Sequence, residues 1–195
     1  MITYIGDHAF SNCEQLRIIP FSETVEFIGE AAFLNCATLT EITLPKTMTE
    51  IKRRLLEGCT SLKSIDLPPH LERLDEDAFK GCTALWEVTV PKSLDETLAF
   101  IGQGPFENTP WLTNQPNGLF YLGKHLLKYT GTMPAGTFVK DIRPDTISIV
   151  GSAFSNCTGL TGIIIPESVK LIGSNAFSNC TGLTGIIIPE SVQLI

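Results

Sequence analysis

Six cysteines recur through the chain at a nearly constant interval, and cysteine is a residue that can bind metals, form disulfides or act as a nucleophile. They are Cys13, Cys36, Cys59, Cys82, Cys157 and Cys180. The first four cysteines are spaced 23 residues apart, and so are the last two. A zinc site needs ligands that converge, commonly at Cys-x-x-Cys spacing, and here no histidine recurs beside the cysteines. We therefore expect no metal site, and we attribute the pattern to a 23-residue repeat.

The other two roles of cysteine can be weighed against the same spacing. Residues at one repeat position form a stacked column and point the same way, which is unusual geometry for a disulfide. A catalytic thiol needs exposure and a basic partner. The sequence favours buried, free thiols that pack as small hydrophobic side chains. A disulfide framework, which would suit an exported protein, is the alternative.

The remaining residues form no recognisable catalytic group. The histidines His8, His70 and His125 lie at different repeat positions. Nucleophile-elbow, zinc-protease, P-loop and dinucleotide motifs are missing from the sequence, and acidic residues do not follow calcium-loop spacing. The sequence thus predicts no catalytic residues, no cofactor and no enzymatic activity.

Composition and charge limit the remaining classes of function. The chain has 195 residues, of which 43% are hydrophobic and 18% charged, with a net charge of −7. This composition is typical of a folded chain. The negative charge argues against nucleic-acid binding, which needs clustered Lys and Arg. No apolar run approaches the ~18 residues of a membrane span, and the first residues lack the features of a signal peptide.

Further columns follow the 23-residue period. A Phe stands three residues before most cysteines and usually follows an Ala, as in Ala32-Phe33 and Ala78-Phe79. Leu follows each cysteine at the third position, and Ile or Val at the sixth. The segment from Leu39 to Leu44 alternates apolar and polar residues, which predicts a strand, and Pro45 then ends it. One turn cannot bury its own apolar face, so stacked turns must share a core.

The repeat unit Cys-x-x-Leu-x-x-Ile-x-Ile/Leu-Pro-x-x-Val-x-x-Ile-Gly-x-x-Ala-Phe resembles the BspA-like, or Treponema pallidum-type, leucine-rich repeat. This resemblance covers nearly the whole chain. It implies an α/β-type, mostly β repeat solenoid, right-handed and curved, with a parallel sheet on its concave face. We count about eight turns. Many members of the family are surface or secreted proteins of host-associated bacteria and some protists, and are described as adhesins.

We expect one leucine-rich-repeat domain over residues 1–195, with regular turns over 1–108 and 146–195. The irregular segment 109–145 predicts a β-hairpin whose turn lies near Gly123-Lys124. The hairpin either packs as an irregular turn of the solenoid or projects from it. Because the chain begins and ends inside a repeat and lacks polar caps, we expect a fragment of a longer array whose open ends can self-associate.

The third repeat departs from the consensus. Lys52, Leu55 and Leu56 replace the Gly, Ala and Phe of the other repeats. The stretch is either a local packing variant or, through Lys52, Arg53 and Arg54, a basic contact patch.

The informative residues for function are those that point outward from the predicted concave sheet. We select seven of them as candidate binding residues: Arg17, Glu41, Lys63, Asp66, Trp86, Glu87 and Thr89. Trp86 is either an interface anchor or a residue shielded by Trp111 or the hairpin. The sequence predicts a non-enzymatic binding module that recognises a protein through this face and the segment 109–145.

The resemblance adds that the partner is a host or extracellular-matrix protein, and that the chain is presented at the cell surface or secreted. The alternative is a structural spacer, or stalk, within a larger surface protein, with no binding site of its own.

Overall fold

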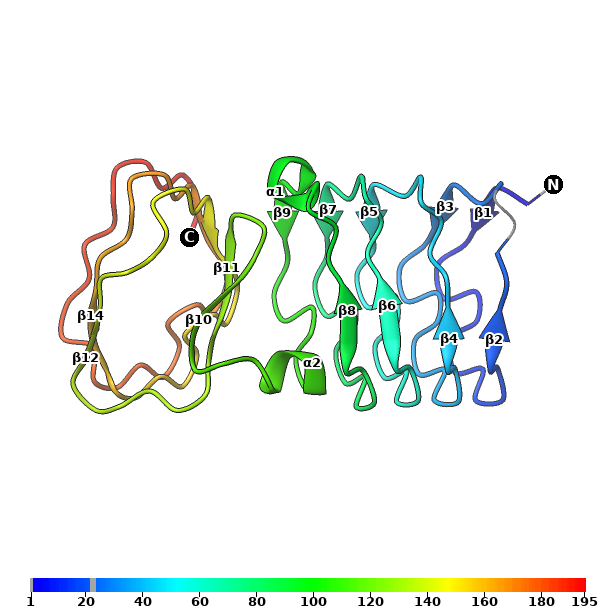
Figure 1. The fold of residues 1–195 in the computed structure, drawn as a ribbon, viewed down its shortest axis with the longest axis horizontal. Coiled ribbons are helices and arrows are strands. Elements are labelled where there is room, and N and C mark those ends of the chain that lie inside the picture. Colours follow the sequence, from blue (N-terminus) through cyan, green and yellow to red (C-terminus); the bar gives the residue numbers. More distant parts are fainter. Residues whose placement is uncertain (1, 22–23) are drawn as a thin grey trace. The chain divides into compact units, whose positions relative to one another are not determined.

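Each 23-residue repeat forms one turn of a solenoid, and most repeats contribute short strands to two ladders (Figure 1). The computed structural model describes residues 2–21 and 24–195. The chain forms two units, Met1–Asn114 and Gln115–Ile195, which are described separately below.

The first ladder of the N-terminal unit, here called the front ladder, follows the leucine at the third position after each cysteine. Its strands are β2 (Ile18–Ile19), β4 (Glu41–Ile42), β6 (Ser64–Asp66) and β8 (Glu87–Thr89). β2 pairs with β4, and β6 pairs with β8, in parallel. Ile18 is opposite Glu41, and Ser64 is opposite Glu87, so each pairing joins residues one repeat apart.

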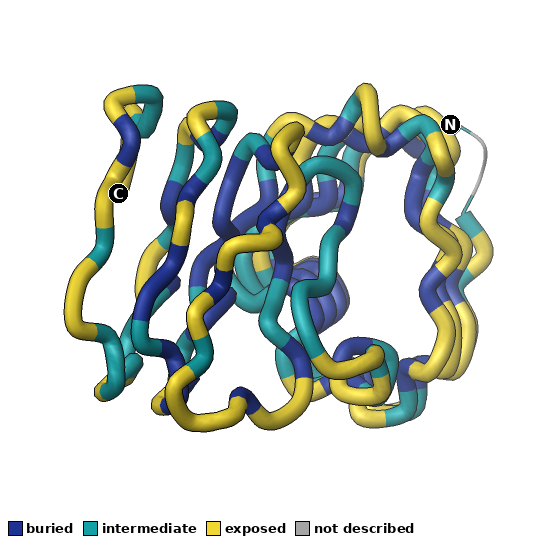
Figure 2. Tube along the Cα trace, turned by 60° about the vertical axis from the view of Figure 1, so that its left-hand side comes forward, coloured by how far each residue is buried: buried dark blue, intermediate teal, exposed yellow. Residues whose placement is uncertain are grey.

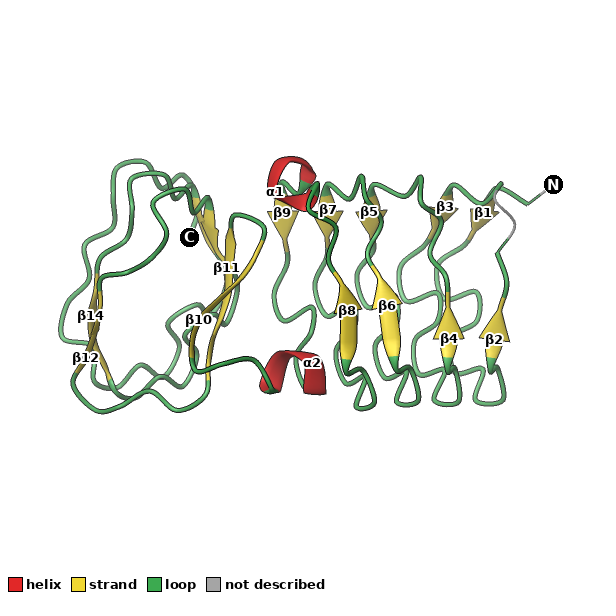
Figure 3. Ribbon diagram, viewed as in Figure 1, coloured by secondary structure: helices red, strands yellow, loops and turns green. Residues whose placement is uncertain are grey.

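The second ladder, here called the back ladder, precedes the tight turn of each repeat (Figure 3). Its strands are β1 (Tyr4–Ile5), β3 (Phe27–Ile28), β5 (Glu50–Ile51), β7 (Arg73–Leu74) and β9 (Phe100–Ile101). All the pairings in it are parallel. Two short helices, α1 (Leu94–Thr97) and α2 (Pro110–Thr113), replace loops in the last turns of this unit. The Thr109 hydroxyl caps α2 by accepting a hydrogen bond from the Leu112 backbone N–H.

The tight turn that follows the back ladder contains two residues in the left-handed backbone region. One lies five residues before the cysteine, as Ala31 (φ 51°) does, and the other lies directly before it, as Asn35 (φ 58°) does. Asn and Gly tolerate this conformation best, which explains why one or the other stands directly before each cysteine. The side-chain amide of Asn35 also donates to Asn12 of the preceding turn, at 3.1 Å.

Buried stretches recur from turn to turn along the chain (Figure 2), and the same residue types fill them in successive repeats. Phe33, Phe79 and Phe154 are fully buried. The rings of Phe10 and Phe33 stack with their centroids 5.3 Å apart, and those of Phe79 and Phe106 at 5.0 Å. Burial of each such side chain contributes about 1.5–3 kcal/mol, so the repeat consensus is chiefly a list of the buried positions.

The third repeat is a packing variant. Leu55 and Leu56 are fully buried in the places of Ala and Phe, and Arg54 takes the left-handed position with φ 56°. The segment forms the same hydrogen-bonded turn as its neighbours, because Phe33 N–H donates to the Leu55 carbonyl and Leu56 N–H to that of Ala78.

In the C-terminal unit, β10 (Gly118–Leu122) and β11 (His125–Thr130) form the expected antiparallel hairpin, with Gly123 (φ 58°) in its turn. The first residues of β11 pair in parallel with β13 (Ser148–Ile149), which pairs with β15 (Leu171–Ile172). Within the C-terminal unit the hairpin therefore supplies a strand to the parallel ladder of β13 and β15 and packs as an irregular turn.

The other ladder of the C-terminal unit joins β12 (Thr137–Val139) to β14 (Leu160–Ile163) in parallel. The structure thus confirms a mostly β leucine-rich-repeat solenoid with 23-residue repeats and one antiparallel pair. The described residues form about seven turns, where about eight were expected.

The expected single domain over 1–195 includes residues 1, 22 and 23, which lie outside the described residues, and it stays a prediction. In the part of the chain that the structure describes, no helix is both long and apolar enough to traverse a lipid bilayer.

Candidate binding face

The cysteines are free thiols, as the sequence predicted, and within each unit they stack from turn to turn. Cys36, Cys59, Cys82 and Cys157 are buried. Four thiols, those of Cys36, Cys59, Cys82 and Cys180, each donate a hydrogen bond to the backbone carbonyl 26 residues earlier. The bond from Cys59 to Phe33, for example, is 3.2 Å long. Burial raises the pKa of the Cys82 thiol to about 12. A thiol held in its neutral form is a poor nucleophile and a poor metal ligand, so this column is structural.

The seven candidate binding residues all lie on the front ladder of the N-terminal unit or directly before its strands, and all are exposed. Glu41 belongs to β4, Asp66 to β6, and Glu87 and Thr89 to β8. The remaining three, Arg17, Lys63 and Trp86, immediately precede β2, β6 and β8. We call the exposed residues of these strands and of the positions just before them the front face.

Trp86 is the most conspicuous side chain on the front face, because 66% of its surface is exposed. The ring of Trp111 packs against Phe106, with the ring centroids 4.6 Å apart. Trp111 therefore does not shield Trp86 within the N-terminal unit, and shielding of Trp86 by the hairpin of the C-terminal unit stays a prediction. Trp is enriched at interface hot spots, so an exposed Trp on this face is a candidate anchor for a partner.

The basic residues of the N-terminal unit divide into two groups. Five of them form ion pairs away from the front face: Lys52 with Glu50, Arg53 with Glu30 and Glu76, Arg54 with Glu57, Arg73 with Asp75, and Lys80 with Asp77. The charges of Lys52, Arg53 and Arg54, the alternative basic patch, are thus paired with neighbouring glutamates.

The other four basic residues, Arg17, Lys46, Lys63 and Lys92, make no ion pair with any residue that the structure describes. Two precede front-ladder strands, and Lys46 and Lys92 follow the prolines that end two of them. The carboxylates of the front face, on Glu41, Asp66 and Glu87, are likewise unpaired among the described residues. Charges of both signs are therefore available to a partner here.

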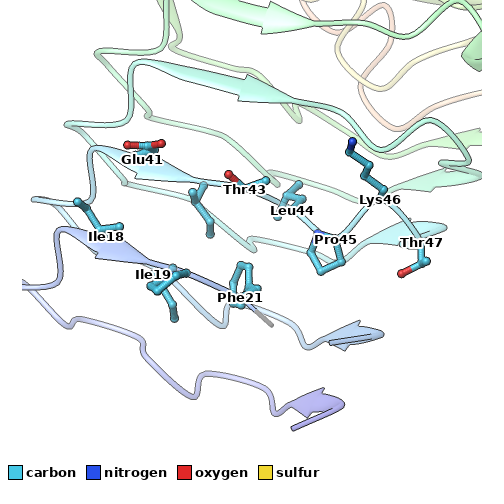
Figure 4. Close-up of a pocket in the computed structure, with 11 residues that line it drawn as sticks. Ile18, Ile19, Phe21, Glu41, Thr43, Leu44, Pro45, Lys46 and Thr47 are labelled. Carbon is cyan, nitrogen blue, oxygen red and sulfur yellow. The ribbon is translucent and has the colours of Figure 1, made fainter. Parts of the chain in front are cut away.

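A hollow of about 570 Å³ opens beside β2 and β4 (Figure 4). Its walls are mostly apolar, and its lining reaches the front-face residues Ile18, Glu41 and Thr43. Phe21 and Leu44 line it as well, and Lys46 contributes a charge. Ile18 is 60% exposed. Ile18 was among the outward strand positions in the sequence but was not selected as a binding residue, and Lys46 was not identified from sequence.

The C-terminal unit contains one pair of residue types that occurs in hydrolases. The His125 ring Nδ1 and the Ser148 hydroxyl lie 2.7 Å apart where β11 meets β13. Both residues are nearly fully buried, at 1% and 3% exposure, so a substrate has no access and the hydrogen bond serves the ladder. Within the described ranges, no group of three His, Cys, Asp or Glu residues is placed to hold a metal ion.

Comparison with known families shows one match. The family model described as the BspA type leucine rich repeat region matches six copies, over residues 1–130 and 139–195. It therefore covers nearly all of the chain, including the hairpin. A search of curated proteins found no match.

Among solved structures, a leucine-rich repeat protein from Bacteroides ovatus is 24% identical, with a TM-score of 0.58, and the match covers 100% of this chain and 66% of that one. The pneumococcal vaccine antigen PcpA is 20% identical, with a TM-score of 0.51, over 98% of this chain and 44% of that one. These likenesses support the fold. The chain spans less than two thirds of the length of either protein.

Proposed function

Since the chain belongs to the BspA type leucine-rich repeat family, we propose that it is a non-enzymatic module that binds a protein partner through the front face. The observation that carries this proposal is Trp86, a large aromatic side chain exposed among unpaired charges. Solvent-exposed Trp surrounded by polar residues resembles the anchors of protein interfaces. The seven front-face residues selected from sequence are the proposed contact residues, and the segment 109–145 is a proposed second contact region.

We further propose that the module is presented at a bacterial cell surface or secreted, as the family resemblance implies. A partner met there is a protein of the host or of its extracellular matrix. The net charge of −7 disfavours nucleic acid as the partner. The mixed charges of the front face give a protein partner both donors and acceptors to meet.

The test is a selection of displayed 12-residue peptides on the purified chain, repeated on a triple variant, Lys63→Ala with Asp66→Ala and Trp86→Ala. We expect the enriched peptides to lose most of their binding to the variant, because truncation of an anchor Trp typically costs about 2 kcal/mol or more. The control variant is Glu26→Ala with Glu72→Ala, whose exposed carboxylates lie directly before back-ladder strands. Peptides that bind the triple variant as well as the unmodified chain would exclude the front face.

A second candidate function is that of a spacer, favoured by the near identity of two repeats in the C-terminal unit. Residues 155–172 and 178–195 differ only at Lys170 and Gln193. Nearly identical turns are typical of an array that sets a length. Deletion of residues 155–177 removes one such turn, and a pure spacer would leave peptide binding unchanged while shortening the molecule. If the selection yields no front-face binder, the spacer becomes the better account.

A further inference from the structure

The front ladder of the N-terminal unit ends at β8, and the hydrogen bonds of the preceding turn show what is missing beyond it. β8 pairs with β6 and with no other strand that the structure describes. The Leu67 N–H donates to the Thr89 carbonyl, one turn further on, at 3.1 Å. Val90 stands 23 residues after Leu67, at the same repeat position. Its N–H makes no hydrogen bond to any residue that the structure describes.

Trp86 lacks the matching bond on the acceptor side. The Arg17 carbonyl accepts from the Thr40 N–H one turn later, at 3.0 Å, and the Lys63 carbonyl accepts from the Trp86 N–H, also at 3.0 Å. The Trp86 carbonyl has the same repeat position as these two acceptors. Among the described residues, however, it accepts no hydrogen bond.

Alternation along β8 adds a third residue to this edge. The Glu87 N–H donates to the residue before β6, and the Thr89 carbonyl accepts from the residue after β6, so both face that strand. The N–H and C=O of one strand residue point to the same side, and those of the next residue point to the other. Val88 therefore directs both groups away from β6. Trp86, Val88 and Val90 together form a row of unpaired backbone groups, here called the β8 edge.

Side-chain burial indicates the same missing strand. Leu44 and Leu67, which precede the prolines that end two front-ladder segments, are 5% and 2% exposed, because the turn that follows covers each of them. Val90 has the same repeat position after β8, yet it is 39% exposed. A segment that fills the place of the missing strand must therefore direct an apolar side chain inward, against Val90.

The rest of the N-terminal unit does not replace this strand. Residues 110–113 form α2, and the Trp111 N–H donates to the Leu85 carbonyl at 2.8 Å, so α2 meets the chain just before β8 and leaves the β8 edge unpaired. β4 and β6 do not pair either, but they lie beside each other (Figure 1). β8 has no such neighbour within its unit on the side away from β6.

We propose that the β8 edge binds an extended segment of a partner protein, which adds to the front ladder as its next strand. Unpaired N–H and C=O groups along a strand are satisfied by another extended backbone. A helix cannot satisfy them, since its own backbone groups are bonded within the helix. The unpaired backbone thus selects the conformation of the segment. This inference rests on the proposed function and adds the form in which the partner binds.

Charge indicates the chemistry of the segment and the kind of molecule that carries it. Glu87 points outward from β8, is exposed and forms no ion pair among the described residues. A basic residue directly beside it would be favourable. The segment therefore alternates apolar residues, directed inward, with polar or basic residues directed outward. The net charge of −7 disfavours a second copy of this chain in that place.

Methylation of backbone nitrogens tests the proposed backbone contacts. The probes are the three most enriched 12-residue peptides that lose binding to the triple variant, each resynthesised with a single N-methyl group at every position in turn. Fluorescence polarisation should show a period of two. Methylation of an N–H that faces β8 should weaken binding by about ten-fold, and methylation of the next position should change it little. A peptide that binds as a helix, or through side chains alone, gives no such alternation, and that result would overturn the inference while the proposed function stands.

Hydrogen exchange followed by NMR detects the same contacts on the protein. The amides of Val88 and Val90 should exchange about ten-fold or more slowly when a selected peptide is bound. The Leu67 amide is the matched control, because it is already bonded to Thr89, and its exchange should change little. Unchanged exchange at both valines in the presence of saturating peptide would contradict the inference.

Two variants of one residue separate the backbone contact from the side chain. Val90→Pro removes the N–H and should weaken peptide binding by about ten-fold, whereas Val90→Ala keeps the N–H and should weaken it less. Thermal unfolding by circular dichroism shows whether both variants fold, and the methylated peptides test the same contact without altering the protein. Equal binding by the two folded variants would show that the Val90 N–H is not used.

Analytical ultracentrifugation of the chain without peptide tests the other occupant of the β8 edge. We expect a monomer. A dimer that Val90→Pro dissociates would show that a second copy fills the edge, and the assignment to a partner protein would be wrong. If no selected peptide depends on the front face, the proposed function fails, and this inference with it.

Discussion

The Cys59 thiol donates a hydrogen bond to the carbonyl oxygen of Phe33 in the preceding turn, over 3.2 Å. The same carbonyl also accepts from the backbone N–H of Cys36. Each buried cysteine of this kind therefore joins two turns at the point where the tight turn ends. The column links the turns by hydrogen bonds and packing, without any covalent bond between them.

Replacement of Cys59 by Ala should lower the free energy of unfolding by about 1–2 kcal/mol, because it leaves a small cavity and removes one hydrogen bond. Cys59→Ser should retain the hydrogen bond, since the serine hydroxyl can still reach the Phe33 carbonyl. It buries a more polar group than the thiol, however. Urea denaturation followed by circular dichroism measures both. Cys13→Ala is the matched control, because Cys13 is only partly buried. An equal loss at both positions would contradict this account of the column.

Gly81 directly precedes Cys82 in the left-handed region, at φ +72°, and the nearest atom that a Cβ would meet is 3.8 Å away. The choice of residue at position 81 is therefore limited by the left-handed backbone conformation and not by the space for a side chain. Gly81→Asn should change the free energy of unfolding by less than about 0.5 kcal/mol, since Asn tolerates this conformation, and Gly81→Val should cost about 1–2 kcal/mol. Urea denaturation of the two variants decides the point. Equal effects of Asn and Val would show that backbone strain does not limit this position.

The buried columns could be predicted from sequence because apolar burial repeats with the period of the chain. Phe33 and Cys59 illustrate this, since each occupies the core position that its spacing indicated. The hairpin turn at Gly123 was predictable for a similar reason, from alternation on both sides of a glycine. The parallel pairing of its second strand with β13 was not, since β13 lies beyond β12 in the chain.

The candidate site was predictable only in part. The outward positions of Trp86 and Lys63 follow from strand alternation, but the pairing of charges does not, because it depends on side-chain reach between turns. Arg53 forms ion pairs with Glu30 and Glu76 in the two adjacent repeats. Such pairs between repeats cannot be read from the sequence, so the sequence alone did not show whether the basic residues were paired or formed a basic patch. The hollow depends on how Phe21 and Leu44 fill the space beside β2 and β4, which no periodicity encodes.

Arg143 ties the hairpin of the C-terminal unit to the segment that follows it. Its guanidinium donates to the Gly123 carbonyl at 3.2 Å and to Asp145 at 3.0 Å, and it lies over the Tyr121 ring, 5.0 Å from its centroid. Arg143→Ala should speed hydrogen exchange in β10 and β11, with a loss of about 1 kcal/mol of local stability, in the range of partly exposed contacts. Arg143→Lys should recover little, because the ammonium lacks the planar fork. Unchanged exchange in the hairpin would show that its turn is held by its own backbone.

The buried thiols should make the protein lose stability in alkali. Desolvation by burial raises the pKa of Cys82 from its usual 9.0 to about 12 and that of Cys157 to about 11. Above pH 9 the unfolded chain releases these protons while the folded chain retains them, so the unfolded state binds fewer protons and the stability falls as pH rises. For Cys82 the slope approaches about 1.4 kcal/mol per pH unit between pH 9 and its folded pKa, and the contribution is fully present below pH 9.

Urea denaturation at pH 7, 9 and 10.5 measures this loss, with a reductant present to keep the thiols free. Lysine and tyrosine side chains also titrate in this range, so the comparison that isolates the thiol is with Cys82→Val, which lacks the titrating group. Between pH 9 and 10.5 the free energy of unfolding of the variant should fall by roughly 2 kcal/mol less than that of the unmodified protein, whatever its stability at pH 7. Parallel curves for the two proteins would mean that Cys82 ionises as readily in the folded chain as in the unfolded one, and that the column is open to solvent.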